Sequence, residues 1–136
     1  MGPSRVRARA GPRKGVVASR ATRADDATMD TVVVLNQDQM GHGDRALGQR
    51  ILQTFLQKSI ALPDFTAILF YNSGVKLVAD GSPVLAELRS LEERGVDLVP
   101  CGTCLNHYAL TPAVGKVANM DAILAELGRA AKVITL

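Results

Sequence analysis

The two cysteines of the chain, Cys101 and Cys104, stand three residues apart just after a short apolar run, Val96–Val99. At this spacing one helical turn brings two thiols close enough for a disulfide, or for a sulfane sulfur to pass between them. Cysteine reacts as the thiolate. A helix that begins near Cys101 would favour the thiolate through its free amide groups and its dipole. The sequence therefore predicts redox or sulfur-handling chemistry here, with Cys101 the more easily ionised and the faster to react.

Two further loops follow apolar runs that resemble strands, at residues 31–36 and 66–71. If these runs and residues 96–100 are strands of one parallel sheet, all three loops lie at its carboxyl edge. Sites are built at that edge in open α/β sheets, and a loop position there favours exposed thiols. We therefore expect one pocket beside the cysteines, formed by Met40, Gly41, His42, Gly43, Asn72, Ser73, Gly74, Gly102 and Thr103.

Strand and helix patterns alternate along the chain, which predicts an α/β fold with a mostly parallel, five-stranded sheet and helices on both faces. The expected strands are residues 31–36, 66–71, 96–100, 114–117 and 132–136. The expected helix starts are an N-cap at Asp44, an N-cap at Ser82 followed by Pro83, and an N-cap at Asn119. Helical periodicity predicts inner faces made by Leu47, Ile51, Leu52, Phe55 and Leu56 in the first helix, and by Ile123, Leu124 and Leu127 in the last.

Other chemistries use some of the same residues. A thioredoxin-type oxidoreductase carries its cysteine pair near the start of the domain, whereas this pair follows the third expected strand. Cys101, Cys104 and His107 are spaced in threes, and His42 would lie at the same edge, so zinc is an alternative. A structural zinc site usually needs two ligand pairs, however, and only one clear pair is present.

The loop at residues 40–43 could offer backbone amides to an anion. It lacks the GxGxxG and P-loop patterns, and a tight turn that needs glycine explains it as well. Two buried, structural thiols are the remaining alternative. We expect no resident metal or cofactor.

Charge and composition narrow the classes of function. The 136 residues are 47% hydrophobic, enough for one core. The net charge of +3 comes from the N-terminal segment, since residues 31–136 hold nine basic and ten acidic residues. Neither a nucleic-acid groove nor a membrane-spanning run is indicated. We expect residues 1–29 to be a disordered basic tail or an over-extended start, residues 30–136 to be the domain, and the compartment to be the cytoplasm.

Several longer motifs together resemble one family. They are Met40–Asp44, Leu69–Leu77, Gly81–Leu85, Leu91–Val96, Cys101–Leu105 and Val117–Met120. In this order they closely resemble the DsrE-like domain of the YedF proteins, which are called sulfurtransferase-like selenium metabolism proteins. The resemblance spans about residues 31–136.

The resemblance implies a three-layer α/β/α, DsrE/DsrF-like fold, a tendency to form homo-oligomers, and a sulfur or selenium relay through a cysteine persulfide. Counted from Gly95-Val96, the sulfur-carrying position falls on Cys101. Cys104 belongs to the YedF version of the motif and is expected to resolve the persulfide or to form a reversible disulfide. The alternative is a non-catalytic oligomeric subunit that binds a sulfur carrier protein.

One departure from the family bears on partners. YedF proteins usually carry an N-terminal TusA-like domain with a Cys-Pro motif, and residues 1–30 contain no cysteine. Either a TusA-like sulfur carrier is a separate partner chain, or this protein has a narrower role.

Overall fold

The computed structural model describes residues 29–136, so the prediction of a disordered tail lies almost wholly outside the described residues. In chain order the elements are β2 (Thr31–Leu35), α1 (Arg45–Lys58), η2 (Ser59–Ala61), β3 (Phe65–Phe70), η3 (Asn72–Val78), α2 (Leu85–Glu93), β4 (Asp97–Pro100), α3 (Gly102–His107), α4 (Met120–Arg129) and β5 (Lys132–Thr135).

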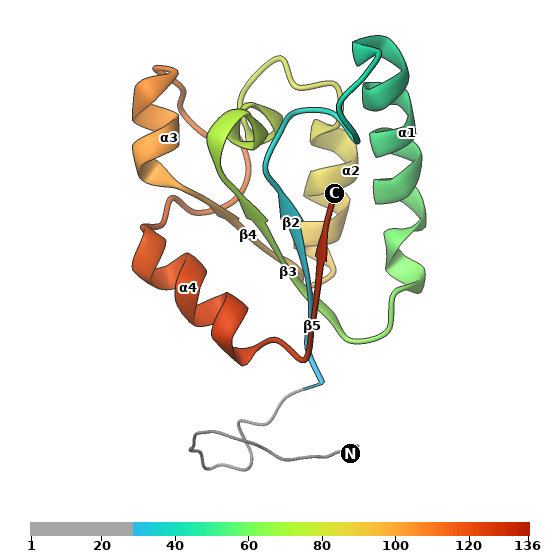
Figure 1. Cartoon of the computed structure of the whole chain (residues 1–136), viewed down its shortest axis with the longest axis vertical. Helices are drawn as coiled ribbons and strands as arrows, with labels where there is room; N and C mark the ends of the chain where they lie inside the picture. The colour runs from blue at the N-terminus through green and yellow to red at the C-terminus, as the bar shows by residue number, and fades with distance from the viewer. Residues whose placement is uncertain (1–28) are drawn as a thin grey trace.

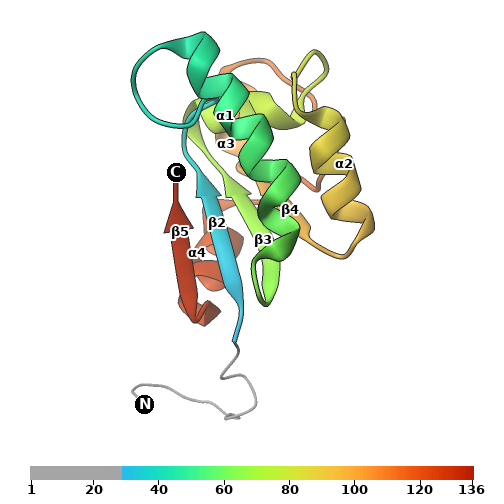
Figure 2. The ribbon, with the colours of Figure 1, turned by 90° about the vertical axis from the view of Figure 1, so that its right-hand side faces the viewer.

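Four parallel strands form the sheet, in the order β4-β3-β2-β5. Helices α1 and α2 cover one face, and α3 and α4 lie on the other side of the sheet (Figure 1). Figure 2 shows α1 in front of the β3 side of the sheet, while β2 and β5 lie to its left and point the same way. The prediction of a parallel sheet with helices on both faces is confirmed.

The core is centred on β2 and β3, the two inner strands. Every residue of β2 is buried, as are the last four residues of β3. A continuous β-branched run such as Val32–Val34 suits this position, because an inner parallel strand is covered on both faces. The carboxyl ends of both strands, at Leu35 and Phe70, therefore lie within the core.

The predicted fourth strand, residues 114–117, is not a strand of the sheet, so the sheet has four strands and not the predicted five. This segment does lie along the outer edge of β4, where the Lys116 amide donates to the Leu98 carbonyl (3.1 Å) and the Ala118 amide donates to the Pro100 carbonyl (2.9 Å). A parallel ladder would also need an amide at position 100 to donate to Lys116, and proline has none. Only one isolated bridge forms, between Cys101 and Ala118.

Two of the three predicted N-caps are confirmed. The Asp44 carboxylate accepts a hydrogen bond from the Leu47 amide (2.8 Å), and the Asn119 side chain accepts one from the Ala122 amide (2.9 Å). The predicted start at Ser82 and Pro83 is wrong, since α2 begins at Leu85. The Ser82 hydroxyl accepts from the Val84 amide (3.2 Å), so it closes a turn that precedes the helix.

The predicted inner faces are partly wrong. In α1 the buried residues are Gly48, Leu52 and Leu56, while Leu47 and Ile51 face outward. Gly48 sets this rotation, because a Cβ there would lie 2.9 Å from the Gln39 Cβ, so the glycine side faces the chain that leaves β2. In α4, Ile123 is fully buried but Leu124 is 65% exposed.

Within residues 29–136, no helix combines the length and the apolar character needed to cross a bilayer.

Candidate functional site

Cys101 is the residue that ends the β4 pairing. Its amide donates to the Phe70 carbonyl (2.9 Å) on the β3 side, and it bridges Ala118 on the other side. Because it is paired on both sides like a strand residue, Cys101 is only 3% exposed and belongs to the core. The expectation that a loop position would leave this thiol exposed is therefore wrong.

Cys104 lies one turn further along α3 and is half-buried. Its Sγ accepts a hydrogen bond from the backbone amide of Asn72 (3.1 Å), and the Cys101 thiol lies within hydrogen-bonding reach. Burial raises the pKa of the Cys104 thiol, the Asn72 amide lowers it, and the neighbouring Cys101 thiol raises it; the net pKa lies above its ordinary value. The two free thiols thus form an interacting pair, and the pocket disfavours the Cys104 thiolate except through the Asn72 amide, which favours it.

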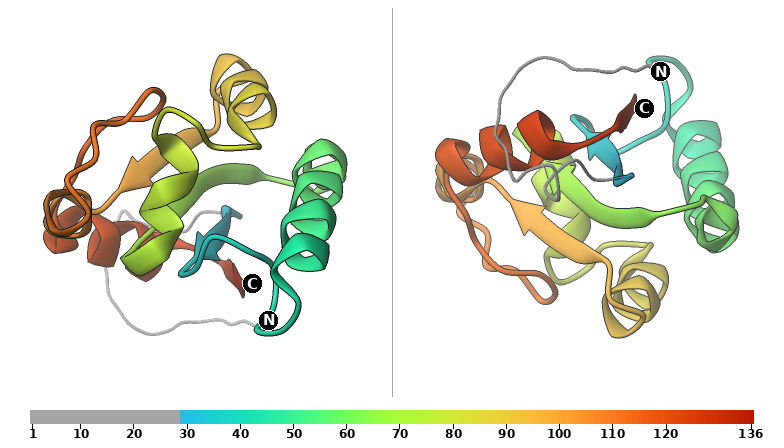
Figure 3. Two further views of the ribbon diagram at one scale, coloured as in Figure 1. Left: turned by 90° about the horizontal axis from the view of Figure 1, so that it is seen from above. Right: turned by 90° about the horizontal axis from the view of Figure 1, so that it is seen from below.

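The 3-10 helix η3 brings Asn72 to this thiol. Figure 3 (left) shows η3 lying across the carboxyl ends of the strands, between α1 and α3. Asn72 has a left-handed backbone (φ +53°), which asparagine tolerates better than most residues. Gly74 permits the close approach to β2, since a Cβ there would lie 2.0 Å from the Leu35 carbonyl oxygen. The second predicted loop is therefore part of the site through its backbone.

Tyr108 and Lys76 extend the contacts from Asn72. The Tyr108 hydroxyl donates to the Asn72 Oδ1 (3.0 Å), and the Lys76 Nζ stands 4.7 Å from the centre of the Tyr108 ring. Sequence reasoning missed both residues. The signal for Tyr108 was present, because it follows Cys104 by four residues and so falls on the same side of the helix.

The start of α3 is not the open amide cluster that the sequence predicted. The Gly102 amide donates to the Ala118 carbonyl (2.7 Å), and α3 has only six residues. Gly102 also leaves room for Val117, whose Cγ1 would lie 3.0 Å from an added Cβ. Thr103 is exposed on the outer side of this turn. The Gly102 amide, which was expected to help stabilise a Cys101 thiolate, is therefore already bonded to the segment beside β4.

The first predicted loop is closed on itself. The Gln39 side-chain amide donates to the carbonyls of Gly41 (3.0 Å) and Gly43 (3.3 Å), while Met40 packs against the core. His42 is exposed. In the described chain no hydrogen bond joins this loop to either thiol. Of the three predicted loops, the second and third are in contact through Cys104, and the first is not.

Ser73, the remaining predicted residue of the second loop, follows Asn72 and is half-buried.

An ion pair between the exposed side chain of Arg45 and the largely buried Asp38 anchors the segment before α1. Arg45 donates to both oxygens of Asp38, at 3.0 and 2.6 Å. The hydrogen bond and charge of Arg45 hold the pKa of Asp38 below its ordinary value, against the effect of burial. Sequence reasoning missed this pair, because neither residue belongs to a local motif.

A hollow of about 640 Å³ opens next to Tyr108. Its charged lining residues are Asp38, Arg45, Lys76 and Asp80. Tyr108 therefore stands between this hollow and the Asn72–Cys104 contact, and the lining carries both signs of charge.

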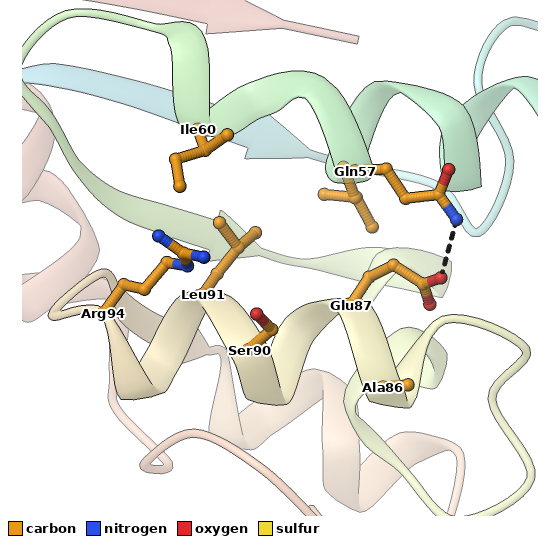
Figure 4. A pocket seen from close by; sticks show the side chains of 8 residues that line it. Gln57, Ile60, Ala86, Glu87, Ser90, Leu91 and Arg94 are labelled. Carbon is orange, nitrogen blue, oxygen red and sulfur yellow. Dashed lines mark hydrogen bonds between the residues drawn. The ribbon is translucent and has the colours of Figure 1, made fainter.

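A second hollow, of about 300 Å³, lies between α1 and α2 (Figure 4). Its main polar contact is the Glu87 Oε2, which accepts from Gln53 (3.0 Å) and Gln57 (3.1 Å). Ile60 and Arg94 line the same groove. None of the predicted site residues lines it.

The residues of the zinc alternative are not gathered into a ligand set. Across residues 29–136, no three His, Cys, Asp or Glu side chains are grouped as a metal site would require. His107 is exposed and its ring packs edge-on against Tyr108.

Comparison with known proteins identifies the fold. No protein-family model and no curated protein matches the chain. Among solved structures, the protein of unknown function MTH1491 from Methanobacterium thermoautotrophicum aligns with a TM-score of 0.61 at 14% identity, over 80% of this chain and 100% of that chain. The ychN protein from E. coli aligns with a TM-score of 0.57 at 15% identity, over 79% of this chain and 100% of that chain. BT1422 from Bacteroides thetaiotaomicron, also of unknown function, aligns with a TM-score of 0.57 at 18% identity, over 86% of this chain and 100% of that chain. The chain thus shares the fold of these proteins, which is the DsrE/DsrF-like fold.

Proposed function

We propose that this protein is a sulfurtransferase-like relay of the YedF type, which carries sulfane sulfur, or selenium, as a persulfide on Cys101. The observation that carries the proposal is the interacting pair of free thiols at the carboxyl end of β4. The DsrE/DsrF-like fold and the motif around Cys101 and Cys104 support it. Cys104 serves as the second thiol of the exchange.

The proposed chemistry is thiol–persulfide exchange. A thiolate of the pair attacks the outer sulfur of a donor persulfide, a new S–S bond forms, and the donor leaves as its thiolate. An acceptor thiolate then removes the sulfur by the same reaction. Each step breaks one S–S bond and makes another, so no external oxidant or reductant is needed. No cofactor takes part.

Intact-mass spectrometry tests this proposal. The reduced protein is incubated with a protein persulfide donor, and a variant with both cysteines replaced by serine serves as the control. We expect the wild type to gain the mass of one sulfur atom and the double variant to gain none. A wild type that stays unmodified would contradict the relay.

The burial of Cys101 favours a second candidate, a non-catalytic subunit that binds a sulfur carrier. A thiol that external reagents do not reach behaves as a small apolar side chain. Under this candidate the double cysteine variant keeps full function in cells. Loss of function in that variant favours the relay.

We also propose that the protein forms homo-oligomers through the α4 side of the sheet. Met120 and Leu124 of α4 are both exposed, although large apolar side chains are usually covered. A single aspartate at Leu124 should shift the particle mass seen by light scattering towards the monomer, while the same change at the exposed Thr103 should not. An unchanged mass in the Leu124 variant would contradict this interface.

A TusA-like carrier is the proposed partner, and the cytoplasm the proposed compartment, since the scheme needs reduced thiols.

A further inference from the structure

We infer that sulfur enters this site through Cys104, and that Asn72, held in place by Tyr108, is the positioning residue for that step. The inference rests on the proposed relay and adds to it the order in which the two thiols act.

Exposure separates the two thiols. An external persulfide must approach the attacking sulfur directly, and Cys101 is 3% exposed between its partners on β3 and at Ala118. Cys104 is half-buried, and its Sγ is turned to Asn72, an exposed residue at the molecular surface. An incoming donor therefore reaches Cys104 first.

The Asn72 amide suits both exchange steps. It donates to the Cys104 Sγ, so it stabilises the thiolate when Cys104 attacks the donor and again when Cys104 leaves. This contact opposes burial and the Cys101 thiol, which together raise the pKa of Cys104. A second contact of Asn72 limits how far the residue, and with it this amide, can turn away from Cys104. The Tyr108 hydroxyl supplies that contact at 3.0 Å.

The sequence of steps balances without a further reagent. The Cys104 thiolate attacks the outer sulfur of the donor persulfide, and the donor leaves as a thiolate. The Cys101 thiol gives up its proton and attacks the outer sulfur now on Cys104, so the persulfide moves to Cys101 and the Cys104 thiolate is restored. The proton released by Cys101 passes to solvent or to the departing thiolate. The sulfur then rests in the buried position, and the same two exchanges in reverse pass it back to Cys104 and on to an acceptor thiolate.

Time-resolved loading of single variants tests the order. A protein persulfide donor is mixed with wild type, Cys101→Ser and Cys104→Ser, and the sulfur on each thiol is mapped by alkylation and peptide mass. We expect Cys101→Ser to take up sulfur on Cys104. We expect Cys104→Ser to take up sulfur on Cys101 at least about tenfold more slowly than the wild type does. If Cys101 loads in Cys104→Ser as fast as it does in the wild type, the inference is wrong and the relay still stands. A wild type that takes up no sulfur would overturn both.

A second measurement needs no sulfur transfer at all. We expect Cys104 of the unloaded wild type to alkylate before Cys101, and the reverse order would overturn the inference.

Tyr108→Phe and Asn72→Gly test the positioning role. Phenylalanine keeps the ring beneath Lys76, and glycine keeps the left-handed backbone and its amide, so both variants lose only the Tyr108–Asn72 hydrogen bond. We expect each to slow Cys104 alkylation about three- to tenfold and to move its pH midpoint upward. Tyr71→Phe is the matched control, because the Tyr71 hydroxyl has no hydrogen bond within the described chain. If Tyr108→Phe matches Tyr71→Phe in rate and pH midpoint, the positioning role is wrong.

Discussion

The α1–α2 groove and the thiol pair are both partly buried polar regions, but they are built differently. In the groove, one carboxylate from α2 accepts hydrogen bonds from two flexible glutamine side chains on α1. Figure 4 shows the bond from Gln57. At the thiols, the donor is the fixed backbone amide of Asn72, and the pairing of Cys101 is also through the backbone. Side-chain contacts in the groove can rearrange when one partner changes. Backbone contacts at the thiols are less free to rearrange, because the chain on either side must move with them, and a reactive site benefits from such preorganisation.

The largest effect that this contrast predicts is at Gly74. Gly74→Ala would push a methyl group to 2.0 Å from the Leu35 carbonyl oxygen, so η3 would have to move. We expect the free energy of unfolding to fall by about 3 kcal/mol or more, measured by chemical denaturation.

Gly43→Ala is the control for this change. An added Cβ at Gly43 meets nothing within 4 Å, and the backbone there is not left-handed. We expect its unfolding free energy to stay within about 0.5 kcal/mol of wild type. Equal effects of the two substitutions would show that η3 is not held rigidly against β2.

A smaller effect is predicted in the groove. Glu87→Ala removes the acceptor of Gln53 and Gln57, and we expect a loss of about 0.5–1.5 kcal/mol with persulfide loading unchanged. Burial raises the pKa of Glu87, but hydrogen bonds from Gln57 and Gln53 outweigh it and the net pKa is lowered. Stability from this group is therefore present above the unfolded pKa of ~4.3 and is lost as pH falls through the folded value.

The pH dependence of unfolding for wild type and Glu87→Ala measures this contribution. We expect the difference between the two proteins to shrink on acidification. A sulfur-loading defect in Glu87→Ala would contradict the structural role of the groove.

The smallest effect is predicted for the Cys104 proton. The folded pKa of Cys104 is raised, so the folded state holds this proton more tightly than the unfolded chain does. The resulting stability is complete below the unfolded pKa of ~8.5 and is lost as pH rises through the folded value. Wild type should therefore lose stability at alkaline pH faster than Cys104→Ser, measured as the difference in thermal midpoint. Parallel pH curves for the two proteins would contradict this.

The elements were largely predictable because their signals are local. The β-branched run at Val32–Val34 and the caps at Asp44 and Asn119 each act within a few residues. The predicted fourth strand failed because Pro100 has no amide, and this matters only once residues 114–118 are known to lie beside β4.

The site was predictable in part for the same reason. The carboxyl-edge rule placed Asn72 beside the cysteines, but no local pattern showed that its backbone would bond Cys104 or that Tyr108 would hold it. The burial of Cys101 also escaped prediction, because it follows from pairing with Phe70 and Ala118 on separate segments.

The most direct test of the account is the final position of the sulfur in the wild-type protein. After loading from a protein persulfide donor and removal of the donor, the persulfide is trapped with an alkylating agent and located by fragmentation of the peptide that holds both cysteines. The account predicts that the retained sulfur is on Cys101, with Cys104 a free thiol. Sulfur retained on neither cysteine, or on Cys104 alone, would contradict it.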